Sequence, residues 1–402
     1  MTKDCLYPFV HLYIEPKGTV GPCCAIYQKE SDYLIQTPED LDSWSNNSNL
    51  TEIRNHFRIN RDMKSPECGQ CINHEKTQVI NFNNKAGLTS PSMRESMFFH
   101  AETDAVEKYY IDPKIKSMHI KFGNLCNLAC RTCSEESSNL LQKEFNVVYR
   151  VNKAELVRGD RFGDLEWYTR PGVFDKLLTY AKDINHFHAS GGEPLVNEYF
   201  WKFIEYCYDN GYNKNIFLGL NTNGTVTLKE KQIDMLRSFR GLQLDVSQDA
   251  TGQLAEYIRT RSSWNLWVNN LKQYQEIIKI DNCRSAPRLR VVLTISILNV
   301  HKLDELIEFI TENDVEWFYQ YVYWPQELCI ANLNNTARQY LIDKYTNHSS
   351  LNFIVEYLNT NDPKVLTEST KDYIDRRDNI AAPMYKNFKK FKELELEWYN
   401  LL

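Results

Sequence analysis

The sequence lacks the features of a membrane, fibrous or disordered protein. Its longest apolar run, residues 289–300, is interrupted by polar residues and is shorter than the ~18 apolar residues that a membrane span requires. No charged and then apolar segment of the secretion-signal type opens the chain. Sequence repeats and low-complexity tracts are absent, and the apolar content of 42% suffices for a folded core. We therefore expect a soluble, globular, cytoplasmic protein with no membrane partner.

The chain also lacks a surplus of basic charge. It contains 47 Lys and Arg against 53 Asp and Glu, which gives a formal net charge of −6. Proteins that bind nucleic acid over a broad surface usually carry a clear basic excess. Nucleic acid is therefore not an expected partner, although a local basic groove is compatible with these numbers.

Cysteine is abundant, and its distribution is informative. There are 11 cysteines, an odd number, in a large chain without a secretion signal. Both facts argue against a disulfide framework. Eight cysteines fall in the first third, all but Cys5 in pairs or clusters, which indicates metal ligation: Cys5, Cys23, Cys24, Cys68, Cys71, Cys126, Cys130 and Cys133. Cys207, Cys283 and Cys329 are isolated in apolar surroundings and are typical of small buried side chains.

From residue 115 onward the hydrophobic pattern alternates between strands and helices. The expected strands are 115–122, 184–189, 216–220, 242–246, 289–297 and 317–323. The expected helices between them are 138–148, 198–210, 228–239, 265–280 and 302–312. Such alternation predicts the α/β class with a parallel sheet, open or partly closed into a barrel.

The chain is long enough for two or three domains. Residues 1–80 are loop-rich and rich in cysteine, which predicts a small α+β domain with a hairpin at 9–14 and 19–21. Residues 81–112 are expected to be a connector, residues 113–330 the main α/β domain, and residues 331–402 a helical C-terminal region. Within that region, apolar residues from Met384 to Leu402 recur at three- and four-residue steps and predict a helix that covers the barrel.

A cysteine loop follows the first strand of the α/β region. It reads Cys126-Asn-Leu-Ala-Cys130-Arg-Thr-Cys133. Iron–sulfur cubanes normally take four cysteine ligands, so three in this loop would leave one iron open to a substrate or cofactor. The alternative is a zinc site that a distant residue completes, such as His119 or Cys207.

Polar turns follow the next three strands. Residues 190–194 read Ser-Gly-Gly-Glu-Pro, residues 221–224 read Asn-Thr-Asn-Gly, and residues 247–250 read Ser-Gln-Asp-Ala. The two glycines allow close approach of a ligand to the backbone, and the glutamate can accept a hydrogen bond from an ammonium group. Ligand sites of parallel α/β folds lie at the carboxyl ends of the strands, where all of these turns are expected.

With the cysteine loop and the Gly-Gly-Glu-Pro turn, residues 113–325 resemble the radical S-adenosylmethionine (SAM) superfamily. The resemblance implies a partial (β/α)6 barrel of the TIM-barrel type. It also implies that Cys126, Cys130 and Cys133 hold a [4Fe–4S] cluster, whose open iron binds SAM. In that family the reduced cluster cleaves SAM, and the resulting adenosyl fragment abstracts a substrate hydrogen.

The same resemblance assigns residues that bind SAM. Gly191, Gly192, Glu193 and Pro194 are expected to receive the amino group, and Asn223 and Ser247 are candidates for contacts to the nucleoside or methionyl part. Arg259 is a candidate partner of the carboxylate, with an exposed helix arginine as the alternative. Two departures leave the adenine contacts unassigned: Thr132 replaces an aromatic residue, and the fifth strand lacks the usual glycines.

Four N-terminal cysteines can close a second metal site. Cys5, Cys23, Cys68 and Cys71 supply four thiolates, which are compatible with zinc or a closed [4Fe–4S] cluster. Residues 41–75 resemble the SPASM/Twitch auxiliary-cluster domains of radical SAM enzymes, in the one-cluster Twitch form. Here the domain precedes the barrel, whereas such domains usually follow it. Cys24 is a spare thiol.

The sequence predicts an oxidoreductase-type radical SAM enzyme that acts on a peptide or protein and takes electrons from an external one-electron donor. A small-molecule oxidoreductase and a non-catalytic iron–sulfur or zinc electron-transfer protein are the alternatives. No catalytic residue beyond the cofactor ligands is assigned. His119, His186 and His188 lie on or beside barrel strands, and alternation places His186 and His188 on one side. They fit a substrate contact or a structural role. The aromatic residues at 317–324 fit a peptide groove or the core.

Overall fold

A computed structural model of the chain describes residues 5–24, 34–46, 48–60, 106–151, 165–279, 288–363, 366 and 369–402. Its centre is one eight-stranded sheet with the order β2-β1-β3-β4-β5-β6-β7-β8. The strands are β1 (His11–Ile14), β2 (Val20–Gly21), β3 (Ser117–Lys121), β4 (His186–Ser190), β5 (Phe217–Thr222), β6 (Gly241–Ser247), β7 (Arg288–Ile295) and β8 (Glu316–Tyr321). From β1 to β8 every neighbouring pair is parallel, and only β1 and β2 run antiparallel.

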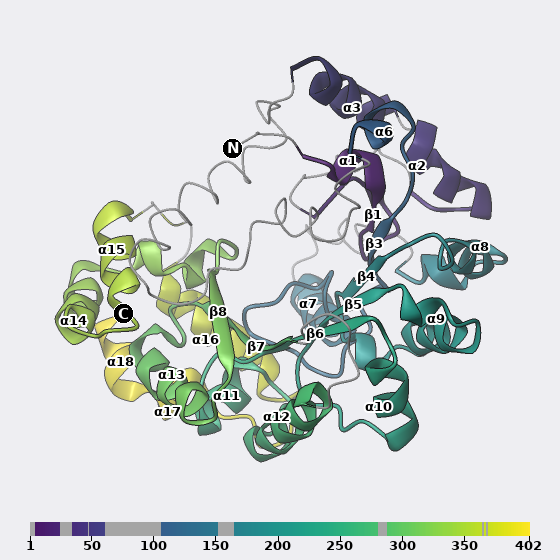
Figure 1. Cartoon of the computed structure of the whole chain (residues 1–402). Coiled ribbons are helices and arrows are strands. Elements are labelled where there is room, and N and C mark those ends of the chain that lie inside the picture. Colours follow the sequence, from purple (N-terminus) through teal and green to yellow (C-terminus); the bar gives the residue numbers. More distant parts are fainter. Residues whose placement is uncertain are drawn as a thin grey trace.

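Helices connect the parallel strands and lie around the outside of the sheet (Figure 1). They are α7 (Asn139–Val151), α8 (Val173–Thr179), α9 (Glu198–Asp209), α10 (Glu230–Arg237), α11 (Gly252–Ile258), α12 (Trp264–Lys279) and α13 (Leu303–Glu312). All six predicted strands and all five predicted helices are confirmed to within a few residues. The sequence analysis missed α8 and α11 because each has only seven residues, too few to show a clear helical period. The α/β class and the partial-barrel fold are confirmed.

The two faces of the sheet differ in chemistry. The outer face packs against the helices with fully buried apolar side chains, such as Met118, Phe187 and Leu218. The inner face is polar: it carries His119 and His188, which are only partly buried. Parallel sheets usually have apolar residues on both faces. A polar inner face therefore indicates an interior that is built to contact a polar ligand.

The N-terminal hairpin joins this same sheet. The predicted hairpin is confirmed as β1 and β2, and β1 pairs in parallel with β3, with Leu12 opposite Met118. The described helices around it are α1 (Tyr7–Val10), α2 (Ser43–Asn46), α3 (Ser48–Asn60) and α6 (Val106–Ile111). Leu12, Ile14 and Val20 belong to the same hydrophobic core as the barrel strands. The hairpin is therefore continuous with the barrel. The predicted boundary at residue 80 lies outside the described residues, and the boundary at residue 112 falls between α6 and β3.

The C-terminal region is helical, as predicted, but its last helix is interrupted. The described helices are α14 (Asn335–Tyr345), α15 (Asn352–Thr360), α16 (Thr370–Ala381), α17 (Phe391–Leu394) and α18 (Leu396–Leu401). The prediction of one helix from Met384 to Leu402 is wrong. Asn387 has a φ of 63°, a left-handed conformation that stops a helix. Phe391 and Trp398 are nevertheless buried, so the apolar spacing correctly marked core residues.

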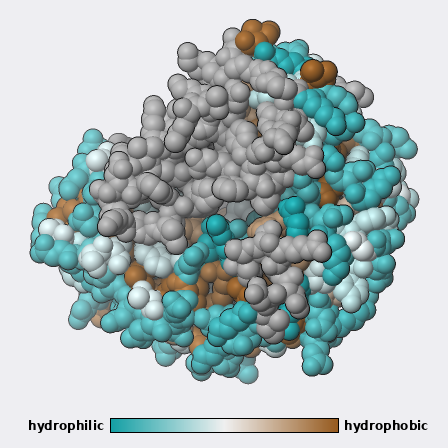
Figure 2. Space-filling view, viewed as in Figure 1, coloured by the Kyte–Doolittle hydropathy of each residue, from teal (hydrophilic) through white to brown (hydrophobic). Residues whose placement is uncertain are grey.

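The visible outer surface is mainly hydrophilic. Hydrophilic residues predominate over the helices at the periphery, and hydrophobic residues are visible mainly toward the centre of this face (Figure 2). Among the helices that the structure describes, none combines the length and the apolar character needed to cross a bilayer.

Candidate active site

The three clustered cysteines lie on one loop at the carboxyl end of β3. Cys130 is buried, and Cys126 and Cys133 are partly buried. The loop is anchored through its backbone: the Ala129 N–H donates to the Thr260 carbonyl at 3.0 Å, and the Arg131 N–H donates to the Ile258 carbonyl at 2.7 Å. A short loop that is pinned in this way presents its thiols in a fixed arrangement.

The pKa values of the three thiols are consistent with metal ligands that become thiolates when a metal binds. Burial raises the pKa of Cys126 to about 12, and the neighbouring Cys130 adds to the shift. The hydrogen bond from the Cys130 thiol raises the pKa of Cys130 and lowers that of Cys133. The guanidinium of Arg259 lowers the pKa of both. A bound cation would stabilise all three as thiolates.

The Gly-Gly-Glu-Pro turn packs directly against the cysteine loop. Gly191 and Gly192 both have positive φ, 77° and 56°. A Cβ at Gly192 would overlap the carbonyl oxygen of Leu125, the residue before Cys126. The same carbonyl accepts a 2.9 Å hydrogen bond from the Glu193 N–H. The glycines therefore allow the turn and the cysteine loop to touch through their backbones, a contact that the sequence analysis did not foresee.

Glu193 is buried and points to the end of β5. Its carboxylate accepts hydrogen bonds from the Leu195 N–H at 3.1 Å, the Thr222 hydroxyl at 2.9 Å and the Asn223 N–H at 2.6 Å. Burial nevertheless raises its pKa to about 7. A buried carboxylate with its pKa raised is a natural acceptor for an ammonium group, since the positive charge would compensate the cost of burial.

Asn223 connects the polar turns to the cysteine loop. Its Nδ2 donates to Oδ1 of Asn127 at 2.8 Å, and Asn127 in turn donates to the Thr225 hydroxyl at 2.8 Å. Asn127 lies inside the cysteine motif. The amide of Asn223 is therefore engaged in fixing this edge of the site, and its role toward a nucleoside stays a prediction.

Ser247 and Arg259 lie on the same side of the barrel. Ser247 is partly buried at the end of β6. Arg259 follows α11 and is buried, so the alternative of an exposed helix arginine is wrong. Its Nε lies 3.0 Å from Asp249 Oδ2, and its charge acts on Cys130, Cys133 and Glu193. The positive charge is thus placed between the cysteine loop and the glycine turn.

These residues fit a [4Fe–4S] cluster with SAM better than a zinc ion. In the described part of the chain, no three His, Cys, Asp or Glu side chains converge in the way that a single metal ion requires. A cubane spreads its thiolates over a larger volume, and its three ligands are present on one pinned loop. His119 bonds to Ser190 at 2.6 Å, and Cys207 is fully buried on α9. Among the described residues, neither joins the three cysteines in a group that could hold a single metal ion.

A layer of histidines lines the barrel interior beneath this site. The Ser117 hydroxyl hydrogen-bonds to Nδ1 of both His11 and His186 at 2.8 Å. The rings of His119 and His188 meet edge to face, with centroids 4.5 Å apart. Burial lowers the pKa of His11 to about 3. Burial is also the main cause that lowers the pKa of His119 and of His188. His186 and His188 do share one face, as strand alternation predicted.

Two charged residues that the sequence analysis missed face the same interior. Arg290 on β7 forms a bidentate ion pair with Asp245 on β6, with distances of 2.8 and 2.9 Å. Asp245 also raises the pKa of His188, against the effect of burial. The signal was present in the sequence, because a charged residue inside each of two apolar strand patterns must face the interior or a partner.

The N-terminal cysteines are described only in part. Cys5 is partly buried before α1, and Cys23 is buried after β2. Cys68 and Cys71 lie outside the described residues, as do residue 47 and residues 61–75 of the Twitch-like segment 41–75. Cys23 and Cys24 both act electrostatically on Tyr13 of β1, which is 5.1 Å from His119 between ring centroids. The second metal site therefore stays a prediction, with one of its proposed ligands, Cys23, near Tyr13 of the barrel sheet.

Comparison with known proteins agrees with this geometry. Residues 120–311 match the family model described as the Radical SAM superfamily. The uncharacterized protein MJ0907 of Methanocaldococcus jannaschii is 29% identical over 139 residues, which cover 33% of this chain and 41% of that protein.

Two solved structures give weak matches. SuiB of Streptococcus suis bound to S-adenosylmethionine has a TM-score of 0.35 and 12% identity, with coverage of 72% of this chain and 58% of that chain. Native anSMEcpe with bound AdoMet and the Kp18Cys peptide has a TM-score of 0.37 and 16% identity, with coverage of 62% of each chain. Both TM-scores are low, so the similarity to radical SAM proteins rests on the family match and on the geometry of the site.

Proposed function

We propose that this chain is a radical SAM enzyme that abstracts hydrogen from a peptide or protein, since residues 120–311 match the Radical SAM superfamily model. The cofactors are a [4Fe–4S] cluster and SAM. The observation that carries this proposal is the backbone contact between the cysteine loop and the Gly-Gly-Glu-Pro turn, through the Leu125 carbonyl and the Glu193 N–H.

The chain's own residues divide the work. Cys126, Cys130 and Cys133 would hold the cluster, which would supply an electron to bound SAM. Gly191–Pro194 receives the amino group of SAM, and Glu193 accepts its hydrogen bond in a buried setting. Arg259 contacts the SAM carboxylate, held in place by Asp249. Asn223 and Ser247 contact the remaining polar parts of SAM.

The substrate enters the polar interior of the barrel. His188 lies two residues before Ser190 on β4, so the histidine layer is ~7 Å below the glycine turn. We propose that the substrate lies in this part of the interior, below the residues that bind SAM. Neutral imidazoles together with the paired Arg290 and Asp245 suit a hydrogen-bonding group such as a peptide amide.

A peptide is favoured over a small molecule by the rim after β8. Tyr323 and Trp324 are 72% and 74% exposed, whereas Tyr319 and Tyr321 stack on Phe353 and Tyr357 and belong to the core. Exposed aromatic residues at the edge of a site are typical of peptide-binding surfaces. The aromatic segment therefore divides into a core part and a surface part.

We further propose that Cys5, Cys23, Cys68 and Cys71 hold an auxiliary [4Fe–4S] cluster of the Twitch kind, which accepts an electron or anchors the substrate. Its test is the iron content of a Cys126→Ala, Cys130→Ala, Cys133→Ala variant after anaerobic reconstitution. About four iron atoms per chain should remain, and Cys68→Ala with Cys71→Ala should remove them. Zinc in place of iron, or no metal, would refute the auxiliary cluster.

The proposed activity is tested by reduction of the reconstituted protein with SAM and chromatography for 5′-deoxyadenosine. The native chain should release the nucleoside, and the triple cysteine variant should release none. Iron that is bound by these three cysteines without any SAM cleavage, with or without added peptides, would instead indicate the non-catalytic electron-transfer protein.

A further inference from the structure

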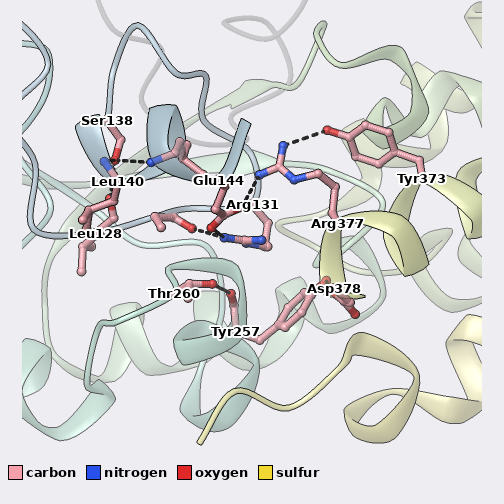
Figure 3. Close-up of polar contacts among 12 residues, drawn as sticks. Leu128, Arg131, Ser138, Leu140, Glu144, Tyr257, Thr260, Tyr373, Arg377 and Asp378 are labelled. Carbon is pink, nitrogen blue, oxygen red and sulfur yellow. Dashed lines mark hydrogen bonds and ion pairs between the residues drawn. The ribbon is translucent and has the colours of Figure 1, made fainter. Parts of the chain in front are cut away.

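The C-terminal region reaches the cysteine loop through a buried ionic network (Figure 3). Arg131 lies between Cys130 and Cys133, and its guanidinium bonds to Glu144 of α7 at 2.5 Å. The other oxygen of Glu144 lies 3.4 Å from the guanidinium of Arg377 on α16. The three side chains are only 2%, 2% and 5% exposed. The carboxylate of Glu144 thus joins the loop to α16, where Arg377 lies 233 residues after Glu144.

A second connection meets the loop from the other side. The Tyr257 hydroxyl donates to Asp378 of α16 at 2.8 Å, and the Phe391 N–H of α17 donates to the second oxygen of Asp378 at 2.7 Å. Tyr257 directly precedes Ile258 and Arg259. The carbonyls of Ile258 and Thr260 are the acceptors that pin the cysteine loop.

Neither connection is explained well by stability alone. Burial of ionic groups is costly, and buried ion pairs often contribute less than well-packed apolar residues of the same size. The best-supported use of such groups is to specify one geometry. Here both sets of interactions end on the same eight-residue cysteine motif, one through its side chain and one through its backbone.

We propose that α16 and α17 form part of the cluster-binding structure, and that Glu144, Arg377, Tyr257 and Asp378 are positioning residues for the cysteine loop. They act through Arg131 and through the Ile258–Thr260 carbonyls rather than by contact with the cluster. The inference rests on the proposed function only in that Cys126, Cys130 and Cys133 are the ligands. It assigns the C-terminal region a role that the family match, which ends at residue 311, does not contain.

The experiment measures how fast a chelator removes iron from the reconstituted full-length chain, together with the electron paramagnetic resonance spectrum of the reduced cluster. The test variants are Arg377→Met, which cuts the ionic connection, and Tyr257→Phe, which removes only the hydroxyl group bonded to Asp378. Arg377→Lys is the conservative variant. Glu395→Gln is the matched control, since it breaks a C-terminal ion pair with His301 and Lys302 that does not reach the loop.

We expect Arg377→Met and Tyr257→Phe to lose iron about five-fold faster than the native chain, which corresponds to one hydrogen bond, and to shift the resonance spectrum. Arg377→Lys should restore part of the difference, and Glu395→Gln should match the native chain. Native-like rates and spectra in both test variants, or equal losses in the Glu395→Gln control, would overturn the proposal. If Arg377→Met fails to fold, Tyr257→Phe decides. A native chain that binds no iron through the three cysteines would refute the proposed function instead.

Discussion

Arg259 and Asp249 form a buried ion pair between the carboxyl ends of two strands and the cysteine loop. Arg259 Nε lies 3.0 Å from Asp249 Oδ2, and Asp249 Oδ1 accepts a hydrogen bond from the Thr294 N–H at 2.9 Å. Asp249 is thereby fixed by β7 and in turn orients Arg259. The pair explains how a residue beyond the end of a short helix can have a defined direction in the site.

The pair leads to a prediction about SAM binding. Replacement of Arg259 by Met should weaken SAM binding about ten-fold, because one charge-assisted hydrogen bond to the carboxylate is lost. Asp249→Asn should have a smaller effect, since the arginine remains but is held less firmly. Equilibrium dialysis with labelled SAM on protein of equal iron content measures both. An unchanged dissociation constant in Arg259→Met would contradict a contact to SAM.

The two glycines of the turn should differ in their tolerance of a methyl group. Gly192→Ala would place Cβ on the backbone carbonyl of Leu125, which cannot move without shifting Cys126. Gly191→Ala would bring Cβ within 2.8 Å of Cβ and Cγ of Lys121 on β3, so it strains that side chain rather than the cysteine loop. At both positions alanine would have to adopt a positive φ, which costs about 1–2 kcal/mol of folding free energy.

We therefore expect Gly192→Ala to lose cluster and SAM binding, and Gly191→Ala to retain the cluster with a modest loss of stability. Iron content after reconstitution and thermal unfolding of the two variants test this difference. Equal iron content in the two variants would show that the turn and the cysteine loop are not tightly packed.

The sequence predicted what local patterns encode. The strands were recognisable from apolar runs, and the order of Cys126, Gly191 and Asn223 along the chain placed them at one edge of a parallel sheet. The contact between Glu144 and Arg377 was not predictable, since a charged residue on a helix gives no sign of a partner 233 residues away. The interruption near Asn387 was missed because apolar spacing continues across it, while only the backbone conformation changes.

Asp378 should make stability depend on pH in an unusual direction for a carboxylate. Burial raises its pKa from 3.8 to about 6, so the folded state holds the proton more tightly than the unfolded state. The resulting stabilisation is complete below pH 3.8 and is lost as the pH rises through about 6.

Asp378→Asn removes this titration. Relative to that variant, the native chain should be more stable at pH 5 than at pH 8 by about 1 kcal/mol. Urea unfolding of the reduced apoprotein at the two pH values provides the measurement. A difference of the opposite sign would mean that the Tyr257 and Phe391 hydrogen bonds dominate over burial.

His11 should have the opposite effect on stability. Burial, and next the charge of His188, lower its pKa from 6.5 to about 3. Here the unfolded state binds the proton more tightly. Neutral His11 therefore contributes fully above pH 6.5, and this contribution is lost as the pH falls from 6.5 toward 3.

His11→Gln is the test, because glutamine stays neutral and can still hydrogen-bond to Ser117, which lies 2.8 Å from His11 Nδ1. Between pH 8 and pH 5 the native apoprotein should lose about 2 kcal/mol more unfolding free energy than the variant. The same urea unfolding series measures it, with Asp378→Asn as the control of opposite sign. Parallel pH profiles for the native chain and His11→Gln would show that His11 takes up a proton in the folded state, and the barrel interior would then be positively charged rather than neutral.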